Sequence, residues 1–145
     1  MDTNQTHSDI LGMNRIFDDF IKPGKIQKEK EVLKDWKIKI QPLDLKDSTI
    51  VHLMGGNTDM PFEATAKIKS ARLLSKAIIS INGYNVVADG QEDREDELRS
   101  ALYTNIMKLP PVVVEKMFQF YLEVEDERDK IFKNPDKVAK EIENF

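Results

Sequence analysis

The sequence predicts a mainly α-helical protein of the α+β class, with an N-terminal helical arm and a β-hairpin followed by a compact bundle of three to four helices. Two patterns lead to this prediction. Apolar residues recur at helical spacing in several segments, and a period-two alternation appears at residues 36–40. Hydrophobic residues make up 40% of the 145 positions and charged residues 33%, which favours a folded domain with a highly charged surface.

The first predicted element is a helical arm within residues 1–26. Ser8 is the expected N-cap, and the KPG sequence at residues 22–24 ends the helix. Apolar side chains at helical spacing form one face of this segment: Ile10, Met13, Phe17, Phe20 and Ile21. The arm precedes the main domain, which we place at residues 27–134, so we expect its apolar face to need a fixed docking partner.

A β-hairpin is predicted at the start of the main domain. Residues 36–40 alternate between apolar and lysine side chains, which is the pattern of a half-buried strand. The preceding run, Ile26 to Leu33, can pair with this strand through a tight turn at Lys34–Asp35. Pro42 ends the second strand because proline cannot donate to the hydrogen-bond ladder of a sheet.

A short helix is predicted next, beginning near Asp44 and closed by Gly55–Gly56. The following helix has Thr58 or Asp59 as its N-cap and Pro61 in its first turn, where proline is tolerated.

We project this second helix as one element over Phe62–Ile81. Its apolar side chains cover about half of the helical circumference, so residues 73–81 (LLSKAIISI) are expected to be buried core. Asn82–Gly83 ends the helix with residues that accept positive φ. A short extended piece can follow at Tyr84–Val87.

Two more helices complete the predicted bundle. Acidic residues at 92–97 suit the N-terminus of the first, and its buried stripe is formed by Leu98, Leu102, Ile106 and Leu109. Pro110–Pro111 separates it from the last helix, Val112–Phe132, whose main apolar face consists of Val113, Met117, Phe120, Val124 and Ile131. Residues 135–145 are a C-terminal tail.

No catalytic, cofactor-binding or metal-binding residue is predicted. The absence of cysteine removes disulfides, thiolate ligands and cysteine nucleophiles, and neither His7 nor His52 has the neighbours of a zinc site. The phosphate-loop patterns and the G-x-S-x-G motif do not occur. We therefore expect a protein that is not an enzyme and needs no cofactor.

Composition also bears on partners. The net charge of −4 disfavours nucleic acid as a partner, although lysines between Lys22 and Lys39 form a basic cluster, because Glu29, Glu31 and Asp35 are interleaved with them. No stretch approaches the roughly 20 apolar residues of a membrane-spanning helix, so no membrane contact is expected. The polar, acidic N-terminus is unlike a secretory signal, and a cytoplasmic location is expected.

Three phrases carry a family resemblance: IKIQPL at Ile38–Leu43, AIISING at Ala77–Gly83 and LPPVVVEKMFQFY at Leu109–Tyr121. In this order, over about residues 28–132, they resemble small tail-morphogenesis proteins of long-tailed bacteriophages. These are the tail assembly chaperones and the related baseplate hub assembly proteins.

The resemblance implies a non-enzymatic phage protein that acts by protein–protein contact. The implied partners are tail or baseplate proteins, namely the tape-measure, tube or hub protein. Association of the chain with further copies of itself is a second expectation. The implied location is the host cytoplasm during assembly, or the tail or baseplate of the virion.

We expect partner contact through six residues: Phe17, Phe20, Ile21, Trp36, Phe118 and Leu122. Three alternatives stay open. The chain could be a structural virion subunit of tail, baseplate or neck that buries the same surfaces permanently. It could be a small regulatory or nucleic-acid-binding module that uses the Lys25–Lys39 cluster. It could also be an enzyme of unrecognised type.

Overall fold

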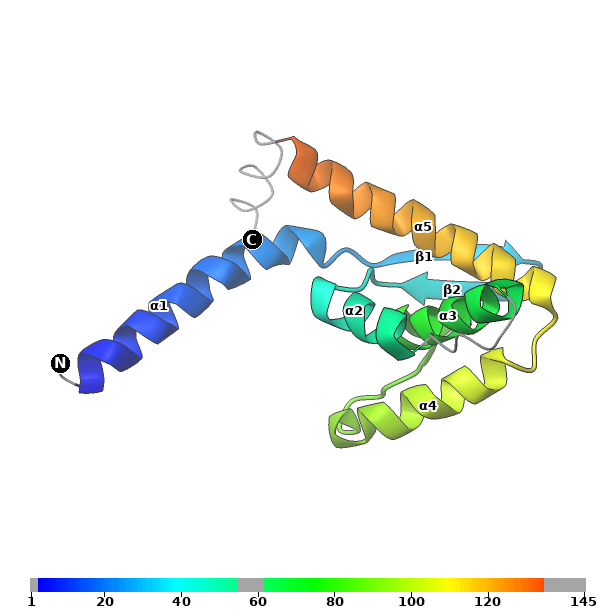
Figure 1. Ribbon diagram of the computed structural model, residues 1–145, viewed down its shortest axis with the longest axis horizontal. Helices are drawn as coiled ribbons and strands as arrows, with labels where there is room; N and C mark the ends of the chain where they lie inside the picture. Colours follow the sequence, from blue (N-terminus) through cyan, green and yellow to red (C-terminus); the bar gives the residue numbers. More distant parts are fainter. Residues whose placement is uncertain (1–2, 55–61, 135–145) are drawn as a thin grey trace. The chain divides into compact units, whose positions relative to one another are not determined.

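The computed structural model describes residues 3–54 and 62–134 (Figure 1). Within these residues, five α-helices and four β-strands confirm the predicted mainly α-helical, α+β class. The helices are α1 (Thr3–Ile21), α2 (Leu45–Met54), α3 (Phe62–Ala77), α4 (Glu95–Ile106) and α5 (Pro111–Lys133). The strands are β1 (Lys28–Leu33), β2 (Trp36–Ile40), β3 (Ile78–Ile81) and β4 (Tyr84–Asn85), and two 3-10 helices are η1 (Lys22–Gly24) and η2 (Glu92–Arg94).

Some helix boundaries follow the sequence signals and others do not. α5 begins at Pro111, within the Pro110–Pro111 pair that was expected to precede it, and Glu95–Glu97 form an acidic first turn of α4. The prediction that Ser8 is the N-cap of the arm is wrong, because α1 already begins at Thr3. Residues 3–7 are polar, so apolar periodicity could not locate this helix start.

Some predicted features lie outside the described residues. They are the stop at Gly55–Gly56, the caps at Thr58 or Asp59, the proline at Pro61 and the tail at 135–145.

The chain forms two compact units. One comprises residues 27–125 and holds the sheet, α2, α3, α4 and most of α5. The other comprises residues 1–26 and 126–145, and so holds α1, η1 and the last turns of α5. In this second unit Pro23 and Ile131 are buried, and a Cβ atom added at Gly24 would lie 2.9 Å from a ring carbon of Phe132. Glycine therefore allows η1 to pass close to the end of α5.

The four strands form one antiparallel sheet in the order β1-β2-β3-β4. The predicted hairpin is confirmed, because Leu33 pairs with Trp36 and leaves Lys34 and Asp35 as the turn. Asp35 adopts a φ of 62°, and its backbone N–H donates to the Glu31 carboxylate at 2.9 Å. The hairpin is half of a larger sheet, which the sequence analysis did not predict.

The prediction of one helix over Phe62–Ile81 is wrong at its C-terminal end. α3 stops at Ala77, and the next four residues form β3, which pairs with β2 on one side and β4 on the other. The cause is tertiary: Ile38 and Ile40 of β2 offer buried partners, and the isoleucines of β3 are β-branched side chains that suit a sheet. Periodicity within the segment alone could not show this pairing.

The expected burial of this stretch is nevertheless confirmed at its centre. Leu74 and Ala77 of α3 and Ile78 of β3 are no more than 1% exposed. α3 also packs against α2 and α4. The opening residues of β3 therefore continue the core that α3 begins.

Asn82 and Gly83 form the two-residue turn between β3 and β4, with φ values of 51° and 82°. Asn82 also joins this turn to the β1–β2 turn, because its side-chain Oδ1 accepts the Lys37 N–H at 2.8 Å and its Nδ2 donates to the Asp35 carbonyl at 3.1 Å. The backbone N–H of Asn82 donates to the Lys37 carbonyl at 2.8 Å. One side chain thus fixes the two turns side by side.

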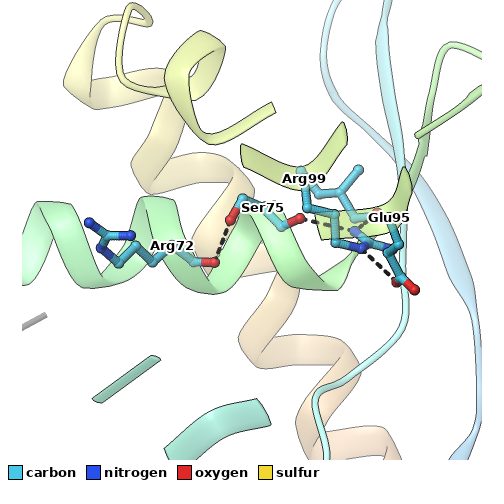
Figure 2. Close-up of polar contacts among 5 residues, drawn as sticks. Arg72, Ser75, Glu95 and Arg99 are labelled. Atoms are coloured by element: carbon cyan, nitrogen blue, oxygen red, sulfur yellow. Dashed lines mark hydrogen bonds and ion pairs between the residues drawn. The ribbon is translucent and has the colours of Figure 1, made fainter. Parts of the chain in front are cut away.

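Arg99 of α4 caps the C-terminal end of α3, as Figure 2 shows. Its Nη1 donates to the carbonyl oxygens of Ser75 and Ile78, both at 2.9 Å, and its Nε donates to the Glu95 carboxylate at 3.1 Å. The last carbonyls of a helix have no partner within the helix, so an arginine from a neighbouring helix supplies the donors. The Ala77 carbonyl accepts the Gln41 N–H at 3.0 Å.

α5 contributes a buried face made of Met117, Phe120, Tyr121 and Val124. Three of these belong to the face that the apolar spacing predicted, whereas the predicted Val113 is half-buried. The Tyr121 hydroxyl donates to the Glu125 carboxylate at 2.7 Å and accepts the Leu43 N–H at 3.3 Å. A buried tyrosine needs such partners for its hydroxyl group. The contact ties α5 to the segment that leaves β2.

We predict that Arg99→Met lowers the free energy of unfolding by about 1–3 kcal/mol, because two backbone carbonyls at the α3–β3 junction lose their donor. The matched control is Arg94→Met, which removes an arginine that pairs with Glu97 on the exposed surface of the same region. Urea unfolding followed by circular dichroism measures both. Equal stability of Arg99→Met and the unsubstituted protein would contradict the capping role.

We predict that Asn82→Gly costs about 0.5–1.5 kcal/mol, since glycine keeps the positive φ but loses both side-chain hydrogen bonds. Asn82→Ala should cost about 1 kcal/mol more, because a Cβ atom is strained in this conformation. Thermal unfolding gives the order of stabilities, with Asn85→Ala in β4 as control. The reverse order of the two Asn82 variants would show that backbone conformation does not limit this turn.

Candidate functional site

Among the described residues, α1 carries the longest run of exposed large apolar side chains. Six side chains form what we call the arm face: Ile10, Met13, Ile16, Phe17, Phe20 and Ile21. Each is between 44% and 61% exposed. At 100° per residue they cover an arc of about 140°, and Leu11 projects to one side of this arc. A helix face of this width normally faces a protein neighbour.

The arm face has acidic edges near its aromatic residues. By the same projection, Asp18 and Asp19 lie on opposite sides of the arc, and Arg15 lies behind it. Asp19 is 3.9 Å from Lys22 in an exposed ion pair, which contributes little in water. A partner of the arm face would meet apolar side chains flanked by carboxylates.

The second apolar surface is a groove of about 610 Å³ in the unit of residues 27–125, which we call the α3–α5 groove. Small side chains of α3, Ala66 and Ser70, lie on one side of it. Larger side chains, Met107, Val114 and Phe118, come from the end of α4 and the start of α5. Lys67 and Glu115 are its charged lining residues.

The sequence-predicted contact residues fall in three different environments. Phe17, Phe20 and Ile21 belong to the arm face. Phe118 lines the α3–α5 groove and stacks on Tyr121, with ring centroids 6.2 Å apart. Leu122, one helical turn later on α5, is 40% exposed.

Trp36 differs from the other predicted contact residues, because it is half-buried. It lies at the start of β2, and its period-two spacing places it on the same face as the fully buried Ile38 and Ile40. Its indole Nε1 is buried and has no hydrogen-bond partner among the described residues. This position suits a role in the edge of the core better than one as an exposed anchor.

A smaller pocket between α3 and α4 is polar. Arg72, Lys76 and Asp96 line it together with Tyr103, and the Arg72 guanidinium lies 4.5 Å from the Tyr103 ring centroid. Arg99 also lines this pocket, but its guanidinium already donates hydrogen bonds to the backbone carbonyls at the end of α3.

Charged pairs on the helix surfaces shift some pKa values. Glu97 raises the pKa of Arg94 through a hydrogen bond and its charge, and Arg94 lowers the pKa of Glu97 in the same way. Asp126 raises the pKa of Lys130. These shifts come from exposed ion pairs within single helices or helix starts, so they describe surface electrostatics.

In residues 3–54 and 62–134, no group of three or more histidine, aspartate and glutamate side chains could hold a metal ion. No helix in the described part of the chain is long and apolar enough to cross a membrane.

Sequence reasoning found most of the arm face and missed the α3–α5 groove. The arm face could be found because it lies on one helix, where spacing alone gives the exposed stripe. The groove combines small residues of α3 with residues of α4 and α5. The small residues at Ala66 and Ser70, one helical turn apart, were its one visible signal.

Comparison of the chain with known proteins finds no matching family model, no matching curated protein and no matching solved structure.

Proposed function

We propose that this chain is a non-enzymatic assembly protein of a bacteriophage tail or baseplate, acting through protein–protein contacts at the arm face. Its partner would be a tail or baseplate protein such as the tape-measure, tube or hub protein. The observation that carries the proposal is the exposed arm face, with six large apolar side chains on one helix.

The energetics support a docking role for the arm face. Burying one exposed valine-sized to phenylalanine-sized side chain stabilises a complex by about 1.5–3 kcal/mol at full burial, before the costs of association. Each arm-face side chain is between 44% and 61% exposed, so each has about half of this contribution left to gain. Aromatic residues such as Phe17 and Phe20 are common anchors of interfaces. An amphipathic helix that lies in a partner groove is a frequent mode of protein recognition.

The phrases that resemble phage tail-morphogenesis proteins meet in one core. Ile38, in the first phrase, pairs with Ile81 in the second. Tyr121, in the third phrase, accepts the backbone N–H of Leu43 in the first. The resemblance therefore concerns residues that determine a fold, and it supports the proposal at that level. The arm face lies outside these phrases and supports it separately.

The proposal is tested by mass spectrometry of purified phage particles, together with a pull-down of the chain from infected cells. Recovery of a tail or baseplate protein, with the chain absent from particles, supports an assembly chaperone. Presence in particles at fixed copy number supports a structural subunit of tail or baseplate. Absence from particles and recovery of no tail or baseplate protein would overturn the proposal.

We predict that Phe17→Asp combined with Phe20→Asp lowers partner recovery in the pull-down by at least about tenfold, because two anchors are replaced by charges. The matched control is Leu11→Asp, on the same helix beside the arm face, which should retain most of the recovery. Circular dichroism confirms that each variant is folded. Undiminished recovery with the double variant would show that the arm face is not the contact.

A further inference from the structure

The polar pocket between α3 and α4, which we call the α3–α4 pocket, lies within the unit of residues 27–125. Arg72 and Lys76 of α3 line it together with Asp96, Ser100 and Tyr103 of α4, and its volume is about 210 Å³. This volume is below the range of about 300–1,000 Å³ that is usual for drug-sized ligands. The pocket therefore suits a small polar group.

The guanidinium of Arg72 is held in place but is not neutralised. It lies over the Tyr103 ring, 4.5 Å from the ring centroid, and this contact orients the planar group. The buried Nε of Arg72 has no hydrogen-bond partner among the described residues, and Arg72 has no carboxylate partner among them. Its two Nη groups therefore remain as donors for a ligand.

Lys76 adds a second positive charge one helical turn after Arg72. Within residues 3–54 and 62–134 it has no carboxylate partner either. Two like charges four residues apart on a helix repel each other and destabilise the helix. A bound anion would attract both side chains, so the pair is suited to anion binding.

Arg99 also lines the α3–α4 pocket, but its donors serve the fold. Its Nη1 donates to two backbone carbonyls at the end of α3, and its Nε donates to Glu95. Figure 2 shows the guanidinium groups of Arg72 and Arg99 at opposite ends of the residues drawn. The capping of α3 by Arg99 therefore does not use Arg72.

The charges at the α3–α4 pocket leave an excess of positive charge. Its cations are Arg72, Lys76 and Arg99, Asp96 is the carboxylate of the lining, and Glu95 pairs with Arg99. Three positive charges against two negative charges leave one positive charge, in a chain whose formal net charge is −4. This local excess favours a small anion over a cation.

We propose that the α3–α4 pocket binds a phosphate group, with Arg72 and Lys76 as its charged contacts. The arginine fork matches the spacing of phosphate oxygens, and lysine acts on phosphate as a point charge. Ser100 and Tyr103 bring hydroxyl groups from the α4 side. Phosphate oxygens point in several directions, so one group can accept from both helices, whereas the two oxygens of a carboxylate lie in one plane. The inference does not rest on the proposed function.

The test is a titration of the full chain with sodium phosphate at constant ionic strength, followed by the NMR amide signals of residues 72–76 and 96–103. The unsubstituted chain should show saturable shifts of these signals. Arg72→Gln and Lys76→Gln should each weaken phosphate binding at least about tenfold, because each removes one charged contact. Asp96→Asn should tighten binding, because it removes the lining carboxylate that repels the anion.

The matched control is Lys67→Gln, which removes a charge of the same sign from α3 but on the side of the α3–α5 groove. It should leave the affinity for phosphate within about twofold, because salt screens charges outside the pocket. Circular dichroism shows whether each variant is folded. If Arg72→Gln does not fold, Lys76→Gln and Asp96→Asn still decide the question through their opposite effects.

Two further probes identify the class of ligand. Glycerol 3-phosphate should bind as phosphate does, which would show that the pocket also accepts a phosphate ester, and acetate should bind at least about tenfold more weakly. The absence of saturable shifts with phosphate would overturn the proposal. Equal weakening by Lys67→Gln and Arg72→Gln, or tighter binding of acetate than of phosphate, would overturn it as well.

Discussion

The fold depends on the way the backbone passes from α3 to β3. α3 ends at Ala77 and the central strand β3 begins at the next residue, inside the core. The last carbonyl groups of α3 therefore have no hydrogen-bond donors within the helix. Buried carbonyls without donors would cost several kcal/mol, so the neighbouring elements must supply them. Arg99 of α4 and the backbone N–H of Gln41 do this, and the junction thereby joins α3, α4 and the sheet.

The same junction explains which parts of the fold the sequence could predict. Local signals gave the hairpin, the start of α5 and the class, because alternation, proline and apolar periodicity act within one element. The switch at Ala77 needed β2 as a partner, so periodicity extended the helix too far. Asn82–Gly83, between Ile81 and Tyr84, is also the residue pair of a tight hairpin turn, whereas the prediction treated it as a helix stop.

The residues of the candidate site also differ in how far the sequence alone could predict their exposure. Phe17, Phe20 and Ile21 could be predicted because one helix determines their exposure. The half-burial of Trp36 could not be predicted from its residue type, since it depends on the sheet, which places Trp36 on the buried face of β2. The groove needed three helices, which a single sequence does not bring together. The arm face and the α3–α5 groove are thus two separate apolar surfaces, one made by a single helix and the other by three.

Hydrogen–deuterium exchange of the full chain and of its Arg99→Met variant tests the central role of the α3–β3 junction most directly. In the unsubstituted chain the amides of β2 and β3 should be strongly protected. Loss of the Arg99 donors should lower the protection of β3 and of the last turn of α3 by at least about tenfold, because these elements meet at the junction. Unchanged protection of both segments in Arg99→Met would contradict the account.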